Sequence, residues 1–291
     1  MTSSLLRELR EEDAAAVAAL FADAFGGARR LDVHEVASWL RDPDLRPEYL
    51  RVLEEDGRIV GYCDIAPRGD VLFVDLAAPG RWPELLDWAE DQAAIHGVKA
   101  SSLFIPHGHE LEDLAIARGY DARRESLTME IRFDAPPRDG EFGELELRTY
   151  RDEDHDALID ALNEAFSEDP FWQKVTEARF AERFLGQHDF DPTLWFLVWD
   201  GDELAGFALD YPSFGSDTDL GHVNWLGVRK PWRRRGLAEA LLRRSFAELY
   251  ARGKPRTVLG VDVQNVTGAL RVYERVGMQP TRRFGTWQKD L

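Results

Sequence analysis

Apolar and polar residues follow one another in the same order twice along this chain. Residues 6–13 and 147–154 share Leu, Arg, Arg, Glu and Asp at matching places, 141 residues apart. Each segment leads into an Ala-rich amphipathic stretch, which predicts a helix ending at Phe25 in the first copy and at Phe166 in the second. Acidic residues at the start of each stretch support these helices, because the helix dipole favours negative charge there.

Each copy then shows the pattern of a β-hairpin. Apolar runs flank a turn at Glu55-Asp56-Gly57 in the first copy and at Asp200-Gly201-Asp202 in the second. Further on, each half has a helical segment that stops at a glycine followed by a large residue, at Gly119 and at Gly277. This order of elements predicts an α/β fold of the mixed α+β type, with a central sheet flanked by helices.

A stretch rich in proline, glycine and charge separates the two halves. Residues 134–141 read Asp-Ala-Pro-Pro-Arg-Asp-Gly-Glu, a composition typical of a connection between domains. We therefore expect two domains of one fold, covering residues 1–133 and 144–291, with a linker at 134–143.

Composition narrows the class of protein. Of the 291 residues, 44% are hydrophobic and 31% are charged, as in folded globular domains. Cys63 is the single cysteine, which excludes a disulfide framework and a cysteine-based zinc site. The net charge of −18 argues against nucleic acid and anionic membranes as partners. With no signal-peptide pattern and no apolar run of membrane length, we expect a cytoplasmic protein.

Candidate chemistry concentrates in a basic loop of the second half. An apolar strand ends at Val228, and helical spacing of apolar residues predicts a helix from Leu237 to about Arg252. Positions 229–235 between them hold five basic residues. Unpaired backbone N–H groups at a helix start attract anions, and Gly236 lets the main chain approach a bulky group closely. The pattern favours a diphosphate site, with a solvated basic helix end as the alternative.

This loop resembles that of a known family. Arg233-x-x-Gly236-x-Ala238, after Leu226-Gly227-Val228, is similar to the acyl-CoA loop of the GNAT N-acetyltransferases. The resemblance covers residues 145–291 well and 5–133 weakly. It implies two tandem GNAT-like domains, each with a central mixed, mostly antiparallel sheet flanked by helices.

A second motif follows in the family's order. Residues 258–263 have the pattern of a strand, and 264–278 are similar to the family's segment in which Asn is followed by a helix, Tyr, Gly and Phe. Here Asn265 and Tyr273 match the family pattern, and Met278 stands in the Phe position. Two motifs in the right order are more specific than either one alone.

By position, the resemblance implies that acetyl-CoA binds as co-substrate and that no metal takes part. Backbone N–H groups of the loop would hold the diphosphate, and the end of the preceding strand would pair with the pantetheine arm. A main-chain N–H near Val228 would polarise the thioester carbonyl. The implied cofactor-binding residues are Leu226, Gly227, Val228, Arg233, Arg234, Arg235, Gly236, Leu237, Ala238 and Asn265.

The resemblance also implies an acid and a base. Tyr273 occupies the place of the proton donor to the departing thiolate, and packing in the core is its other interpretation. Where many family members carry a glutamate base, this chain has His222. A neutral imidazole accepts a proton near pH 7, but a histidine hydrogen-bonded at the sheet edge fits the pattern equally well. Asp219 and Asp262 are alternative bases.

The acceptor pocket of the family is roofed by the first two helices and their loop. In this chain the loop includes Glu168, Asp169, Phe171 and Trp172. Acidic groups there would attract an ammonium and aromatic rings would stack on it, whereas an exposed acidic loop is the alternative. We therefore expect Glu168, Asp169 and Trp172 to bind a small-molecule amine.

The first half lacks these features. Gly80 has no basic motif around it, Pro83 removes a donor N–H from the helix start, and Ala115 stands where the second half has Tyr273. We expect this domain to be degenerate for catalysis. His107 and His109 flank a glycine as a metal clip would, but without a third ligand nearby a polar loop is favoured.

Two classes of function fit these observations. In the first, the protein moves an acetyl group from acetyl-CoA to a primary amine by direct attack in a ternary complex, as a monomer or homodimer. In the second, it is a non-catalytic acyl-CoA-binding or sensor protein. Replacing Tyr273 separates the two, because only an enzyme would lose turnover.

Overall fold

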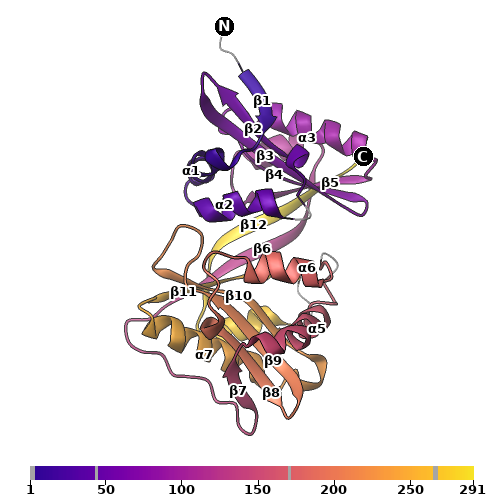
Figure 1. The fold of residues 1–291 in the computed structure, drawn as a ribbon. Helices are drawn as coiled ribbons and strands as arrows, with labels where there is room; N and C mark the ends of the chain where they lie inside the picture. Colours follow the sequence, from indigo (N-terminus) through magenta and orange to yellow (C-terminus); the bar gives the residue numbers. More distant parts are fainter. Residues whose placement is uncertain (1–3, 43–44, 170–171, 265–267) are drawn as a thin grey trace. The chain divides into compact units, whose positions relative to one another are not determined.

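The chain folds into two units of the same mixed type (Figure 1). The computed structural model describes residues 4–42, 45–169, 172–264 and 268–291. The first unit consists of residues 1–126 and 282–291, and the second of residues 127–281.

The first unit has a sheet in the order β1-β2-β3-β4-β5, followed by the end of β12 (Gln279–Asp290). Neighbouring strands are antiparallel except β4 and β5, which are parallel. Its elements are β1 (Ser4–Glu8), α1 (Ala14–Ala24), α2 (Val33–Ser38), β2 (Leu50–Glu55), β3 (Arg58–Arg68), β4 (Val71–Ala77), α3 (Trp82–His96), β5 (Ala100–Pro106) and α4 (Leu111–Ala117).

The second unit repeats this plan. Its strands lie in the order β6-β11-β10-β9-β8-β7, in which β6 is Asp121–Arg132, and β10 pairs in parallel with β11. Its elements are β7 (Glu146–Thr149), α5 (His155–Ala165), α6 (Glu177–Phe180), β8 (Trp195–Asp200), β9 (Glu203–Tyr211), β10 (Leu220–Val228), α7 (Leu237–Ala251), β11 (Arg256–Asp262) and α8 (Ala269–Arg275). Each unit therefore has the mixed, mostly antiparallel sheet that the sequence predicts.

Two long strands contribute residues to both units. They are β6 (Asp121–Arg132) and β12 (Gln279–Asp290), and the division of the chain falls within each of them. The sequence places the boundary at 134–143 instead. Residues 282–291 fall in the first unit because residues 284–290 pair with β5, from Phe284 against Pro106 to Asp290 against Ala100. Residues 134–143 belong to the second unit.

The sequence repeat corresponds to a repeated ion pair. Arg7 at the end of β1 donates to both carboxylate oxygens of Asp13, at 2.7 and 2.8 Å. Arg148 in β7 makes the same pair with Asp154. In both copies the aspartate also accepts a backbone N–H three residues earlier. Asp13 and Asp154 are buried, so the repeated motif joins the first strand of each unit to the start of its first helix.

Local patterns predict most of the elements correctly. Both hairpin turns lie where expected, and α1 and α5 end with Phe25 and Phe166 as their C-caps. Helix α7 begins at Leu237 and ends at Ala251, against the expected Arg252.

The second unit buries apolar side chains on both faces of its sheet. Leu209 of β9 packs in a cluster with Leu158 of α5, while the residue before it in the strand, Ala208, packs with Leu241 of α7. Because successive strand residues point to opposite faces, α5 and α7 cover opposite sides. The strand that they enclose, β10, leads directly into the basic loop.

Candidate active site

Strands β10 and β11 separate halfway along the second sheet. Leu220–His222 pair in parallel with Arg256–Val258, and no pair follows between the two strands among the described residues, although both strands continue. The other edge of β10 stays paired with β9 as far as Val228 opposite Gly206. From Leu226 to the N–H of Val228, β10 therefore has one backbone edge free to pair with an extended ligand, whereas the carbonyl of Val228 accepts from Arg233.

The basic loop after β10 has two residues with left-handed backbone conformation. Gly236 has φ = 84° and Arg234 has φ = 64°. A left-handed arginine is strained, because its Cβ crowds the backbone, and such strain gathers at binding sites. Arg234, Arg235 and Gly236 are all exposed. The loop therefore presents its main chain to solvent.

The start of α7 offers a row of free donors. No side chain caps this helix, and the first N–H bonded to the preceding turn is that of Ala240, which donates to Gly236. Within the described ranges, the N–H groups from Arg234 to Glu239 reach no acceptor. Together with the helix dipole they form a cradle for an anion. We call Arg234 to Ala238 the cradle.

Not every basic side chain of the loop is available to a ligand. Arg233 donates to Glu168 at 2.6 Å, to the carbonyl of Val228 at 3.1 Å and to that of Ala165 at 3.1 Å. Glu168, expected to bind the amine, is thus paired with Arg233, expected to bind the cofactor. The hydrogen bond from Arg233 lowers the pKa of Glu168. Arg233 holds the loop against β10 and the end of α5.

Arg229 is held in a similar way. It donates to Glu164 at 2.6 Å, and the backbone N–H of Lys230 donates to the other oxygen of that carboxylate at 3.0 Å. Trp232 is buried and donates its indole N–H to Asp200 at 2.8 Å. These contacts fix the first half of the loop, and they leave Arg234 and Arg235 as its outward-facing basic side chains.

Tyr273 lies in α8 with 7% of its surface exposed. It packs in a cluster with Val223 of β10 and Val261 of β11, the two strands that separate. Burial raises the pKa of Tyr273 to about 12, so the phenol keeps its proton at neutral pH. Both interpretations of this residue agree with its position, since the ring is packed and the hydroxyl remains protonated.

His222 is the last residue of β10 that pairs with β11. Its ring packs edge-on against Phe214, with 4.8 Å between the ring centroids. Removal from water lowers the pKa of His222 to about 4, so the imidazole is neutral at pH 7. Of the alternative bases, Asp219 is exposed, and Asp262 accepts the N–H of Gln264 at 2.7 Å.

Aromatic rings line the α5 side of the same strand. Trp172 stacks on Phe166 at 4.8 Å and meets Trp225 of β10 edge-on at 5.5 Å. Its indole N–H donates to Asn163 at 3.2 Å, which fixes the ring. Asp169 is exposed beside them. The predicted residues Phe171 and Asn265 lie outside the described ranges.

The sequence missed a pocket next to the cradle. A pocket of about 290 Å³ lies between the start of α7 and residues 141–145. Its walls include Phe142 and Leu145 from that segment and Arg235 and Leu237 from the loop and helix. The prolines at 136 and 137 indicated a linker and hid this contribution. Phe142 was the available signal, because an aromatic ring is unusual in a solvated connection.

The corresponding region of the first unit is built differently. Helix α3 begins with Trp82 and Pro83, and the backbone N–H of Glu84 donates to the backbone carbonyl of Arg81. Arg81 itself is paired with Glu55 at 2.6 Å. Ala115 is fully buried in α4, without a polar group to offer. At the point where β4 and β5 stop pairing, Asp75 forms an ion pair with Arg29.

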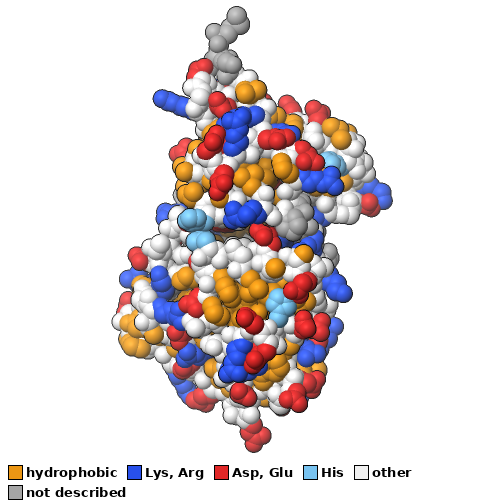
Figure 2. Space-filling model, viewed as in Figure 1, with side chains coloured by type: hydrophobic (Ala, Val, Ile, Leu, Met, Phe, Trp, Pro, Cys, Tyr) orange, Lys and Arg blue, Asp and Glu red, His pale blue; other side chains and the backbone are white. Residues whose placement is uncertain are grey.

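The two histidines that flank Gly108 are engaged within the fold. His107 pairs with Glu112, while the ring of His109 lies 2.8 Å from the carbonyl of Ala24. Elsewhere His155, Asp156 and Glu177 bring ligand atoms within 4.8 Å of one another on a largely exposed surface. On the face drawn in Figure 2, acidic and basic side chains are interspersed. Among the residues described, no helix has the length and apolarity to cross a bilayer.

Comparison with known proteins gives a consistent picture. A family model described as "Acetyltransferase (GNAT) family" matches residues 155–278. The mycothiol acetyltransferase of Beutenbergia cavernae is 30% identical over 261 residues, which cover 83% of each chain. That of Streptomyces scabiei is 35% identical over 139 residues, and this alignment spans 42% of the relative's length and 48% of this chain.

Solved structures resemble the whole chain. A GCN5-related N-acetyltransferase from Sphaerobacter thermophilus superposes with a TM-score of 0.75 at 28% identity, covering 99% of this chain and 95% of that one. A tandem GNAT protein from the clavulanic acid biosynthesis pathway also gives a TM-score of 0.75, at 15% identity and with 99% and 98% of the two chains covered. At 15% identity, the similarity to the tandem GNAT protein shows a shared fold and no more.

Proposed function

We propose that this chain, which belongs to the GNAT family of acetyltransferases, moves an acetyl group from acetyl-CoA to the primary amine of a small molecule. The observation that carries the proposal is the row of unpaired N–H groups at the exposed start of α7, directly after a strand with a free edge. The cradle suits a diphosphate, and the free edge suits an extended amide-containing arm. Acetyl-CoA has both parts.

The reaction needs two proton movements. The neutral amine attacks the thioester carbonyl carbon, a C–N bond forms, and the C–S bond then breaks to release the CoA thiolate. We assign to Tyr273 the proton that this thiolate takes up, because its phenol is protonated at neutral pH and lies in α8 beside the separated strands.

The proton lost by the amine needs an acceptor. We assign it to His222, which is neutral above about pH 5 because its pKa is lowered to about 4. A base this weak does not retain the proton, so it passes the proton on to water. The acceptor site would lie along Trp172 and Asp169, since Glu168 is already paired with Arg233.

We place the transfer in the second unit. The first unit has Pro83 in place of a donor N–H and Ala115 in place of a tyrosine, and Arg81 is engaged with Glu55. On this proposal the domain that binds acetyl-CoA is the one that includes residues 144–281, and the first unit has no catalytic role of its own.

A thiol-release assay tests the activity. Purified protein is mixed with acetyl-CoA and a panel of amines: the deacetylated precursor of mycothiol, aminoglycosides, polyamines and peptide N-termini. The precursor belongs in the panel because curated relatives bear the name mycothiol acetyltransferase. Amine-dependent release of free thiol supports the proposal, and its absence with every amine would contradict it.

The Tyr273→Phe variant separates an enzyme from a sensor. In an enzyme, losing the phenol hydroxyl should lower kcat by roughly 100-fold or more, with acetyl-CoA affinity changed less than about threefold. The matched control is Tyr250→Phe in the last turn of α7, far from the start of that helix, and this variant should keep its turnover. Equal turnover in wild type and Tyr273→Phe would remove the catalytic role from this residue.

A further inference from the structure

Residues 139–145, which we call the strap, are docked on helix α7 rather than free. Arg244 of α7 donates to Asp139 at 2.9 Å, and the backbone of Gly140 lies so close to the helix that a Cβ there would be 2.0 Å from the carbonyl oxygen of Ala240. Only glycine allows this approach. The strap therefore has a defined path along the helix.

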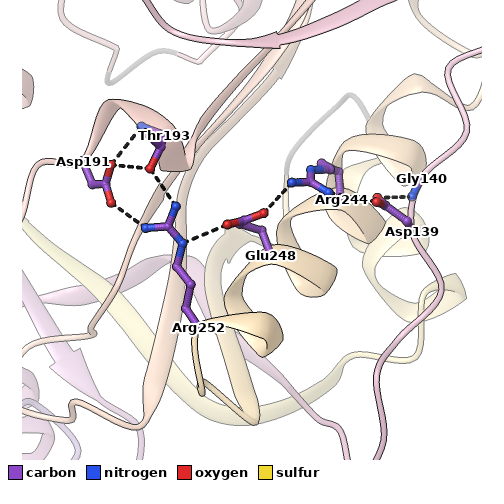
Figure 3. Close-up of polar contacts among 7 residues, drawn as sticks. All are labelled: Asp139, Gly140, Asp191, Thr193, Arg244, Glu248 and Arg252. Atoms are coloured by element: carbon purple, nitrogen blue, oxygen red, sulfur yellow. Dashed lines mark hydrogen bonds and ion pairs between the residues drawn. The ribbon is translucent and has the colours of Figure 1, made fainter.

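A chain of charged contacts fixes the base of the strap (Figure 3). Arg244 also pairs with Glu248, which in turn accepts from Arg252 at 2.9 Å. Arg252 reaches Asp191 and Thr193 in the segment before β8. Asp139 itself accepts the N–H of Gly140 at 2.7 Å. Arg244 and Arg252 each lie between acceptor groups, so these charge-assisted hydrogen bonds hold the start of the strap against α7.

The strap forms one wall of the pocket of about 290 Å³. Phe142 and Leu145 face the pocket from the strap, and Trp232 and Leu237 line it from the loop and helix. Arg235 and Gly236 also line it, so the pocket is continuous with the cradle. Trp232 is held by its bond to Asp200, and in the described ranges Arg235 pairs with no carboxylate.

The pocket and the gap between the strands lie on opposite sides of the cradle. The side chains around the pocket, Trp232 and Leu237, pack with β8 and β9 residues such as Val198 and Ala205. The gap lies on the other flank of β10, toward β11. A ligand whose diphosphate occupies the cradle and whose acyl arm enters the gap can therefore direct its other end into the strap pocket.

We propose that the strap pocket binds the adenine ring of CoA, with Phe142 as the aromatic surface on which the ring stacks. This inference rests on the proposed function, since it requires acetyl-CoA in the cradle. A purine is flat and aromatic, which suits a pocket with Phe142 and Trp232 in its walls. Arg235 supplies a positive charge where the pocket meets the cradle, next to the phosphates of the bound ligand.

Binding measurements on two donors test the inference. Isothermal titration compares acetyl-CoA with S-acetyl-4′-phosphopantetheine, which has the same acyl arm but no adenosine. Phe142→Ala should weaken acetyl-CoA binding roughly 10-fold, the usual cost of removing one base-stacking ring, and leave the truncated donor within twofold of wild type. Phe142→Leu keeps the bulk without the ring, so it should show the same selective loss without a change in folding.

The control is Leu147→Ala, which alters the same apolar cluster outside the pocket walls and should leave both affinities unchanged. Equal weakening of both donors, or no weakening of acetyl-CoA by either Phe142 variant, would overturn the strap assignment. Failure of the wild type to bind acetyl-CoA at all would instead refute the proposed function. An 8-azidoadenine analogue of CoA gives a second readout: labelling of the peptide with residues 139–145 supports the assignment, and labelling confined to other peptides contradicts it.

Discussion

Asp210 shows how one buried residue ties stability to pH. It lies in β9 with none of its surface exposed, and its carboxyl group faces Ser245 of α7. Burial raises the pKa of Asp210 well above its usual value. The folded protein therefore holds this group in its neutral, protonated form, whereas the unfolded chain releases the proton above about pH 4.

The Asp210→Asn variant tests this reasoning. Because the pKa is raised on folding, the wild type loses stability as pH rises from the unfolded value toward the folded one. An amide of the same shape carries no charge, so the variant should gain stability over wild type by about 1–2 kcal/mol at pH 8 and by little at pH 4. Urea unfolding at both pH values measures the difference. A variant that is less stable than wild type at pH 8 would refute it.

His222 changes the pH dependence of stability in the opposite direction to Asp210. Its pKa is about 4 in the folded chain and about 6.5 when unfolded, so stability falls as pH drops through that window. His222→Gln removes this dependence, and its stability relative to wild type should rise between pH 7 and pH 4.5 by at most about 3 kcal/mol. The same urea series measures the effect. If the two proteins change in parallel over this range, the histidine is in contact with water and not desolvated.

Single residues also show how far sequence can define a site. The sequence indicates Gly236 and Tyr273 because their places in a motif are local and ordered. It does not show that Arg233 binds Glu168, since the partners are separated by β8, β9 and β10 and a charge alone does not specify its counterion. The desolvation of His222 likewise depends on the neighbours that folding brings to it.

At the scale of elements, helix α7 has a left-handed glycine at each end. Gly236 caps its start with φ = 84° and Gly253 follows its end with φ = 80°, and a Cβ added at either position would point into open space. An alanine at either position is strained by the same backbone conformation, at a cost of about 1 kcal/mol. Only Gly236, however, is part of the cradle.

This pair of glycines gives a matched test. Gly236→Ala and Gly253→Ala should lower the free energy of unfolding by similar amounts, while only Gly236→Ala should weaken acetyl-CoA binding, by roughly 10-fold or more. Thermal unfolding and isothermal titration measure the two quantities. Similar affinities for the two variants would mean that the start of α7 does not approach the ligand.

The strap shows why element patterns alone miss part of the architecture. Prolines and charges at 134–141 correctly indicate that no helix or strand forms there, since β7 starts only at Glu146. They do not show that Gly140 packs against Ala240, because close packing of a loop depends on a surface formed elsewhere in the chain. The absence of regular structure was predictable, and the docking was not.

At the scale of the whole molecule, β12 connects the two units covalently and completes the first. Its residues 284–290 pair with β5, and Trp287 packs against the core of the first unit. Local patterns do not indicate which sheet the strand after Gly277 joins, because pairing partners are set by long-range contacts. The repeat predicts two similar units, but it does not show that the end of β12 completes the sheet of the first unit.

The Trp287→Ala variant should therefore affect the first unit. Loss of this ring should lower its stability by about 2–3 kcal/mol and speed amide exchange in β4 and β5. Hydrogen exchange read by mass spectrometry should show little change in β9 and β10. Gln288→Ala, the next residue along the strand, is the control. Faster exchange confined to the second unit would show that this strand belongs energetically to that unit.

The place of β12 has a consequence for synthesis on the ribosome. The first unit's helices and its first five strands emerge early, but the strand that covers β5 is translated only after the whole second unit. During that interval β5 has an unpaired edge, and such edges recruit other nascent strands. The half of the protein that is made first is thus the last to be finished, and its exposure to chaperones lasts as long as translation of the other half.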